Sequence, residues 1–168
     1  TDQILQDAVA RHLAGDLGGA EKLYSDLLRQ NPTHPDGLHL SGLLALQRGQ
    51  PAEAERLIRA AIAITPKAPA FHGNLGSALL NSGRPDEAMA SYRRAVELDE
   101  NFVDGWRNIA SLSAQLGDHE QSALAYSTVV RLTGAADGGA LGYLGLELAV
   151  LCDWDNLPIV REAISALP

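Results

Sequence analysis

The stretch that decides the fold is residues 69–102, which read PAFHGNLGSALLNSGRPDEAMASYRRAVELDENF. Apart from Gly83 and Pro85 near its middle, the second half is dominated by residues that favour helices. Glycine ends a helix readily because it adopts the left-handed backbone conformation without steric cost. Proline starts a helix well because the first turn needs no N–H group. The stretch therefore predicts two helices joined by a short turn.

The same pattern recurs every 34 residues along most of the chain. The aligned columns are Gly15, Gly49, Gly83 and Gly117; Ala8, Gly42, Gly76 and Ala110; Ala20, Ala54, Ala88 and Ser122; Tyr24, Ile58, Tyr92 and Tyr126; and Leu27, Ala61, Ala95 and Val129. Small residues at fixed places predict antiparallel helices that approach closely, while the bulkier column fills the gap beside them. The Ala61 and Ala95 column is expected to let each second helix pack against the next unit. We therefore predict an all-α array of helix pairs.

With Pro32, Pro66 and Trp106, these columns resemble the tetratricopeptide repeat (TPR) family. The resemblance implies a helix–turn–helix right-handed superhelix, an α-solenoid, with a concave groove lined by the first helix of each unit. It predicts four units at 1–34, 35–68, 69–102 and 103–136. Residues 137–168 are expected to form a divergent helical pair that links to or caps the array.

The last segment departs from the period. Leu151 stands where a spacing of 34 would place the next glycine. Residues 139–152 are predicted to form an apolar helix capped by Asp137, and a second helix is expected to begin near Pro158. Cys152, at the end of the apolar helix, is expected to be a buried small hydrophobic residue.

Composition excludes several classes of protein. The 168 residues carry 13 Lys and Arg against 21 Asp and Glu, and no basic block exists, so binding to nucleic acid is not expected. A single cysteine forms no internal disulfide, which favours a reducing compartment and a cytoplasmic location. Residues 141–152 are the longest apolar stretch, shorter than the roughly 20 residues of a membrane span, so no membrane association is expected.

No catalytic, metal-binding or cofactor-binding motif is present. The five histidines are His12, His34, His39, His72 and His119. None lies at the spacing of a metal site or beside a nucleophile, so each is expected to be hydrogen-bonded within the fold or solvated. We expect no cofactor and no metal ion.

The candidate binding residues are two asparagines. Asn74 and Asn108 are 34 residues apart, each two residues before a small packing residue, so both are expected on the inner face of the array. An amide can donate to and accept from the backbone of an extended peptide. The column is short, because Gln6 and Leu40 stand at the earlier places. A clamp for a peptide carboxylate is disfavoured because no lysine lines the first helices.

A second resemblance is more particular. Residues 102–110 are similar to repeats of the soluble protein O-GlcNAc transferases, and residues 151–155 are similar to the segment that follows their repeats. This implies a parent enzyme that moves N-acetylglucosamine from UDP-GlcNAc to Ser or Thr, with a catalytic domain after residue 168. The chain would recruit acceptor proteins and supply no catalytic residue. A stand-alone TPR adaptor remains the alternative, and homo-oligomerisation through exposed apolar surface remains open.

Overall fold

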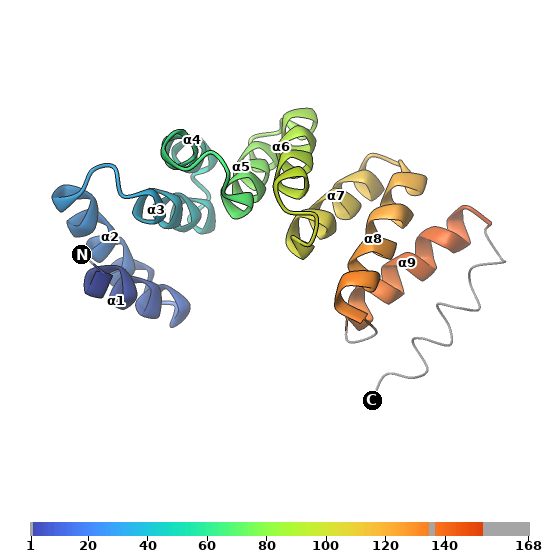
Figure 1. The fold of residues 1–168 in the computed structure, drawn as a ribbon, viewed down its shortest axis with the longest axis horizontal. Coiled ribbons are helices and arrows are strands. Elements are labelled where there is room, and N and C mark those ends of the chain that lie inside the picture. Colours follow the sequence, from blue (N-terminus) through green and yellow to red (C-terminus); the bar gives the residue numbers. More distant parts are fainter. Residues whose placement is uncertain (1, 135–136, 153–168) are drawn as a thin grey trace. The chain divides into compact units, whose positions relative to one another are not determined.

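The computed structural model describes residues 2–134 and 137–152. The helices in these ranges are α1 (Asp2–Leu13), α2 (Leu17–Gln30), α3 (Pro35–Gln47), α4 (Pro51–Ile64), α5 (Pro69–Asn81), α6 (Pro85–Leu98), α7 (Val103–Gln115), α8 (His119–Thr133) and α9 (Gly138–Val150) (Figure 1). No strand occurs in this part of the chain. The predicted all-α helix–turn–helix fold is confirmed. The chain divides into two compact units within α6, between Ser91 and Tyr92.

Glycine ends the first helix of each pair, as the period predicted. The backbone φ angles are +79° at Gly15, +70° at Gly49, +74° at Gly83 and +78° at Gly117. A Cβ atom added at any of them would meet nothing within 4 Å. Glycine is therefore required by the backbone conformation and not by lack of space. Proline opens the helices that follow the turns at Gly49 and Gly83.

In the first unit, the small columns allow close helix contact. A Cβ atom on Gly42 of α3 would lie 2.6 Å from Ile58 Cγ1 and 3.2 Å from the Ala54 carbonyl oxygen of α4. Ala61 is fully buried in a cluster that includes Phe71 of α5. The small side chain at position 61 therefore lets α4 pack against the following repeat, as predicted.

In the second unit, α9 lies against α8 (Figure 1). The buried face of α9 includes Leu141, Leu144 and Leu148. As predicted, Asp137 caps this helix, because its Oδ1 accepts the Ala140 N–H at 2.9 Å. None of the described helices has the length and apolar character needed to cross a bilayer.

The repeat does continue into α9, but with a spacing of 35. Helix α8 has 15 residues, whereas α4 and α6 have 14, so α9 begins 35 residues after α7. Cys152, with φ +55°, takes the place of Gly117. Its N–H donates to the Ala149 carbonyl at 3.2 Å, as the Gly117 N–H donates to Ala114 at 3.1 Å. The expectation that Leu151 replaces the glycine is therefore wrong.

The same shift places Gly145 in the column of the small residues Gly42, Gly76 and Ala110. Cys152 is exposed, so the expectation that it is a buried small hydrophobic residue is wrong. The helix predicted near Pro158 and residues 153–155 of the transferase-like segment lie outside the described residues.

Candidate peptide-binding surface

Both predicted asparagines belong to longer polar rows. On α5, Asn74 is followed by Ser77 and Asn81, and on α7 Asn108 is followed by Ser111 and Gln115. Residues at i, i+3 and i+7 share one face of a helix. All six side chains are exposed or half-buried. We call each row of three a polar stripe. Only the first member of each stripe was predicted from the sequence, although the period of 34 relates all three pairs.

Asn74 also has a structural contact in the first unit. Its Nδ2 lies 2.7 Å from Nε2 of His39, a buried residue of α3. The imidazole lies against Phe71, with ring centroids 4.3 Å apart. Burial lowers the pKa of His39 to about 4, so the ring is neutral at pH 7 and its Nε2 accepts from the amide. Part of the Asn74 amide is therefore engaged in joining α3 to α5.

The second unit holds a pocket of about 370 Å³ between α7 and α9. The residues that line it are Arg107, Ser111, Ala114 and Gln115 of α7, Tyr126 of α8, and Tyr143, Leu146 and Glu147 of α9. We call it the α7–α9 pocket. Two members of the α7 polar stripe form part of one wall. A volume of this size falls within the usual range of ligand pockets in proteins.

Two tyrosines form an aromatic wall of the α7–α9 pocket. The rings of Tyr126 and Tyr143 are stacked, with centroids 5.3 Å apart and an angle of 16° between planes. Tyr126 is buried, whereas Tyr143 is 57% exposed. Burial, followed by the nearby Tyr143 and Glu147, raises the pKa of Tyr126, so its phenol is neutral at physiological pH. The pair therefore offers a partly open aromatic surface.

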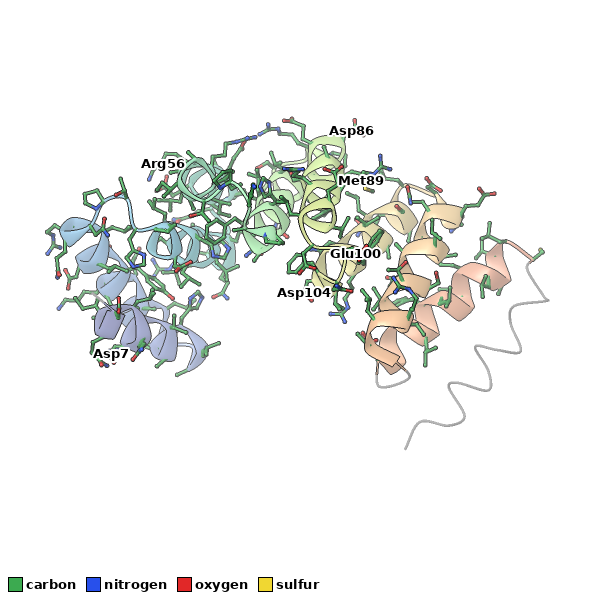
Figure 2. The ribbon with its side chains drawn as sticks, viewed as in Figure 1. Asp7, Arg56, Asp86, Met89, Glu100 and Asp104 are labelled. Carbon is green, nitrogen blue, oxygen red and sulfur yellow. The ribbon has the colours of Figure 1, made fainter. Side chains whose placement is uncertain are left out.

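The one basic side chain that lines this pocket is neutralised by its neighbours. Arg107 lies 3.2 Å from the carboxylate of Asp104, which Figure 2 labels near the start of α7, and it also pairs with Asp137. The Ala140 N–H, and then Arg107, lower the pKa of Asp137, so the Asp137 carboxylate is charged at pH 7. Because Arg107 already has two anionic partners, it is a poor site for the carboxylate of a bound peptide.

A buried carboxylate is among the groups that line the pocket. Glu147 is 5% exposed, and it accepts the Ser122 hydroxyl at 3.0 Å and contacts His119 Nδ1 at 2.7 Å. Both groups bind the carboxylate, which differs from the Ser-to-His hydrogen bond of a nucleophilic site. The cluster therefore stabilises a buried acid and does not resemble a catalytic triad. This cluster was not predicted, although two signals of it were visible in the sequence: a serine in an alanine column and a glutamate in an apolar helix.

The remaining histidines have structural contacts. His12 lies within hydrogen-bond distance of Tyr24 and Gln47, His34 caps α3 through the Gly37 N–H, and His72 contacts the Pro66 carbonyl. In residues 2–134 and 137–152, no group of three His, Cys, Asp or Glu side chains is placed to hold a metal ion.

Comparison with known proteins identifies the repeats. A tetratricopeptide repeat family model matches residues 39–101 and 74–140. The peroxisomal targeting signal receptor of Eremothecium gossypii is 37% identical over 65 residues, which are 39% of this chain and 11% of the receptor. Human protein O-mannosyl-transferase TMTC3 is 29% identical over 85 residues, which are 51% of this chain and 9% of the transferase.

Solved structures have the same fold. A structure of pilF from Pseudomonas aeruginosa superposes with a TM-score of 0.87 at 16% identity, covering 98% of this chain and 74% of that protein. At this identity the likeness concerns the fold alone. The chain itself spans only about a tenth of the two curated relatives described above.

Proposed function

The chain belongs to the tetratricopeptide repeat family, and on this premise we propose that it binds an extended segment of a partner protein through the first helices of its repeats. The observation that carries the proposal is the polar stripe, which occurs at equivalent places on α5 and α7. The similarity to the peroxisomal targeting signal receptor of Eremothecium gossypii supports the same proposal.

The chemistry of the stripes suits a peptide backbone. Asn74, Asn108 and Gln115 carry amides that both donate and accept, and the serines between them carry hydroxyl groups. Such groups match the alternating N–H and carbonyl groups of an extended chain whatever its side chains are. The stripes would therefore give affinity with little sequence preference, and selectivity would come from elsewhere on the surface.

The test is a selection of random dodecapeptides displayed on phage, followed by affinity measurements on the synthetic peptides. We expect Asn108→Ala and Asn74→Ala to weaken binding by about fivefold to tenfold each, the effect of one or two hydrogen bonds. The matched control is Gln30→Ala, which removes an exposed amide on the second helix α2 and should change nothing. Unchanged affinity in both asparagine variants, with helicity intact, would refute the role of the stripes.

We further propose that the parent protein is a glycosyltransferase that moves N-acetylglucosamine from UDP-GlcNAc to Ser or Thr, and that this chain recruits its acceptors. The similarity of residues 102–110 to O-GlcNAc transferase repeats supports this proposal. The named O-mannosyl-transferase among the relatives is consistent with a repeat array attached to a transferase. The proposal includes a cytoplasmic location, which the single cysteine favours.

A stand-alone adaptor is the second candidate. The receptor among the relatives carries repeats of this kind, and its name describes targeting and no sugar transfer. An assay of the longer natural protein for transfer from UDP-GlcNAc separates the two candidates. Transfer to an acceptor protein supports the glycosyltransferase, whereas absence of both transfer and nucleotide binding supports the adaptor. Peptide binding is expected in either case, so this assay leaves the proposal about the stripes untouched.

A further inference from the structure

The exposed face of α9 occupies the place of a polar stripe but is apolar. With the spacing of 35, Tyr143, Leu146 and Val150 stand where α7 carries Asn108, Ser111 and Gln115. Their exposed fractions are 57%, 60% and 51%. We call these three residues the apolar stripe. At equivalent positions, α9 therefore exposes apolar side chains where α7 exposes polar ones.

The apolar stripe is not the core face of α9. The core face carries Leu141, Leu144 and Leu148, which are at most 8% exposed. The hydrophobic residues of α9 thus serve two separate faces. One is buried in the core, and the other stays largely exposed, although Tyr143 on it stacks against Tyr126 of α8. Large apolar side chains that remain exposed beside a pocket are a common mark of a binding site.

The α7–α9 pocket places the two chemistries opposite each other. Ser111 and Gln115 contribute to the α7 side, and Tyr143 and Leu146 contribute to the α9 side. A peptide backbone held by the polar stripe of α7 would thus have the apolar stripe within reach of its side chains. The open ring of Tyr143 favours an aromatic side chain, because aromatic rings pack edge-to-face or offset.

The charges near the pocket favour one kind of residue next to the aromatic residue of the bound peptide. Arg107, the single basic side chain lining the pocket, is paired with Asp104 and Asp137, and Glu147 is a third carboxylate. His119 offsets Glu147 only when it is protonated. Among the residues that line the pocket and the ion-pair partners of Arg107, carboxylates outnumber basic side chains, which favours a cationic neighbour and disfavours an acidic one.

We infer that the α7–α9 pocket is a specificity site that takes an aromatic or large aliphatic side chain of a bound peptide, next to a Lys or Arg. This inference rests on the proposed function, because it names the class of peptide that the chain selects. The polar stripe of α7 would hold the backbone, and the apolar stripe would supply the preference.

The test uses blocked octapeptides of Gly and Ser with two central residues, titrated into the isotope-labelled 168-residue chain and followed by NMR. The central pairs are Phe-Lys, Ala-Lys and Phe-Glu. We expect Phe-Lys to bind about tenfold more tightly than Ala-Lys, the effect of burying one aromatic side chain, and more tightly than Phe-Glu. Equal affinity for Phe-Lys and Ala-Lys, or no binding of Phe-Lys at millimolar concentration, would overturn the inference.

A pair of matched variants locates the site. Leu146→Asp places a charge in the apolar stripe, and Leu124→Asp places the same charge on an equally exposed leucine of α8, 61% exposed, which does not line the pocket. We expect the first variant to abolish the preference for Phe-Lys and the second to keep it. Equal behaviour of the two variants would contradict the assignment.

Two outcomes separate this inference from its premise and from other occupants. If selected phage peptides lose affinity in Asn108→Ala but not in Leu146→Asp, the proposed function holds and the specificity site is wrong. If Leu146→Asp instead converts a dimer to a monomer in sedimentation, and Phe-Lys does not compete with the dimer, the apolar stripe is a self-association surface and the inference is overturned.

Discussion

Helices α7 and α9 both contain 13 residues, and each ends in a capping leucine followed by a residue of positive φ. That residue is Gly117 after α7 and Cys152 after α9. On the exposed faces, however, α7 carries a polar stripe and α9 an apolar stripe. The way a helix ends and the chemistry of its exposed face therefore vary independently between repeats. The ending depends on backbone conformation, whereas the face depends only on side chains that the packing leaves open.

One buried position holds an apolar residue in α7 and a carboxylate in α9. Exchanging these residues should have the largest effect on stability. Leu112 of α7 and Glu147 of α9 are equivalent and are 2% and 5% exposed. Leu112→Glu would bury a carboxylate without the Ser122 and His119 contacts of Glu147. We expect it to reduce the free energy of unfolding by about 3–5 kcal/mol, measured by urea denaturation.

The reciprocal variant sharpens this test. Glu147→Leu leaves the Ser122 hydroxyl without its acceptor, while the half-exposed His119 can still reach water. We expect a loss of only about 1 kcal/mol. Equal losses in the two variants would show that the hydrogen bonds to Glu147 do not stabilise the buried charge.

Acid should destabilise the first unit through His39 of α3. The equivalent position of α7 holds Arg107, which does not titrate in this pH range. Burial lowers the pKa of His39 from 6.5 to about 4 in the folded chain, so the unfolded chain binds more protons as the pH falls. The stabilisation by neutral His39 is thus complete above about pH 6.5 and is lost progressively toward pH 4, an effect of about 3 kcal/mol.

The measurement is the unfolding free energy between pH 7 and pH 4, compared between the original chain and His39→Gln. The glutamine variant should show the weaker pH dependence in this window, because it cannot titrate. His72→Gln is the control, since His72 lies on the neighbouring helix and is only half-buried. If His72→Gln flattens the pH profile as much as His39→Gln, the burial of His39 is not the cause.

The smallest effect concerns the ends of the two helices. Cys152 adopts φ +55°, a conformation that costs a residue with a Cβ atom about 1 kcal/mol relative to glycine. Cys152→Gly should therefore stabilise the end of α9 by about that amount, measured by hydrogen exchange of its last amides. Leu151→Gly is the matched control, because φ at Leu151 is −76° and glycine there should destabilise the helix. If Leu151→Gly stabilised α9 and Cys152→Gly destabilised it, Leu151 would be the residue equivalent to Gly117, and the spacing would be 34.

Much of the fold could be predicted from residues close together in sequence. The helix ends at Gly15, Gly49, Gly83 and Gly117 follow from a local backbone requirement, and the cap of α9 follows from Asp137. The candidate peptide-binding surface was predicted less completely. The period identified Asn74 and Asn108, but whether either contacts a peptide stays a prediction. The pocket was not predicted, because its walls come from three helices and its depth depends on how they pack.

The sequence by itself determined the helix pairs, their turns and the small residues between them, because each depends on conformational preferences or side-chain sizes that recur at a constant spacing. Only the tertiary structure decided the register of α9, since one additional residue in α8 moves every later position by one. It also decided the burial of Glu147 among residues 25 and 28 positions away, and the engagement of Asn74 with His39 across 35. Such contacts depend on how separate helices pack, which a column of aligned residues does not specify.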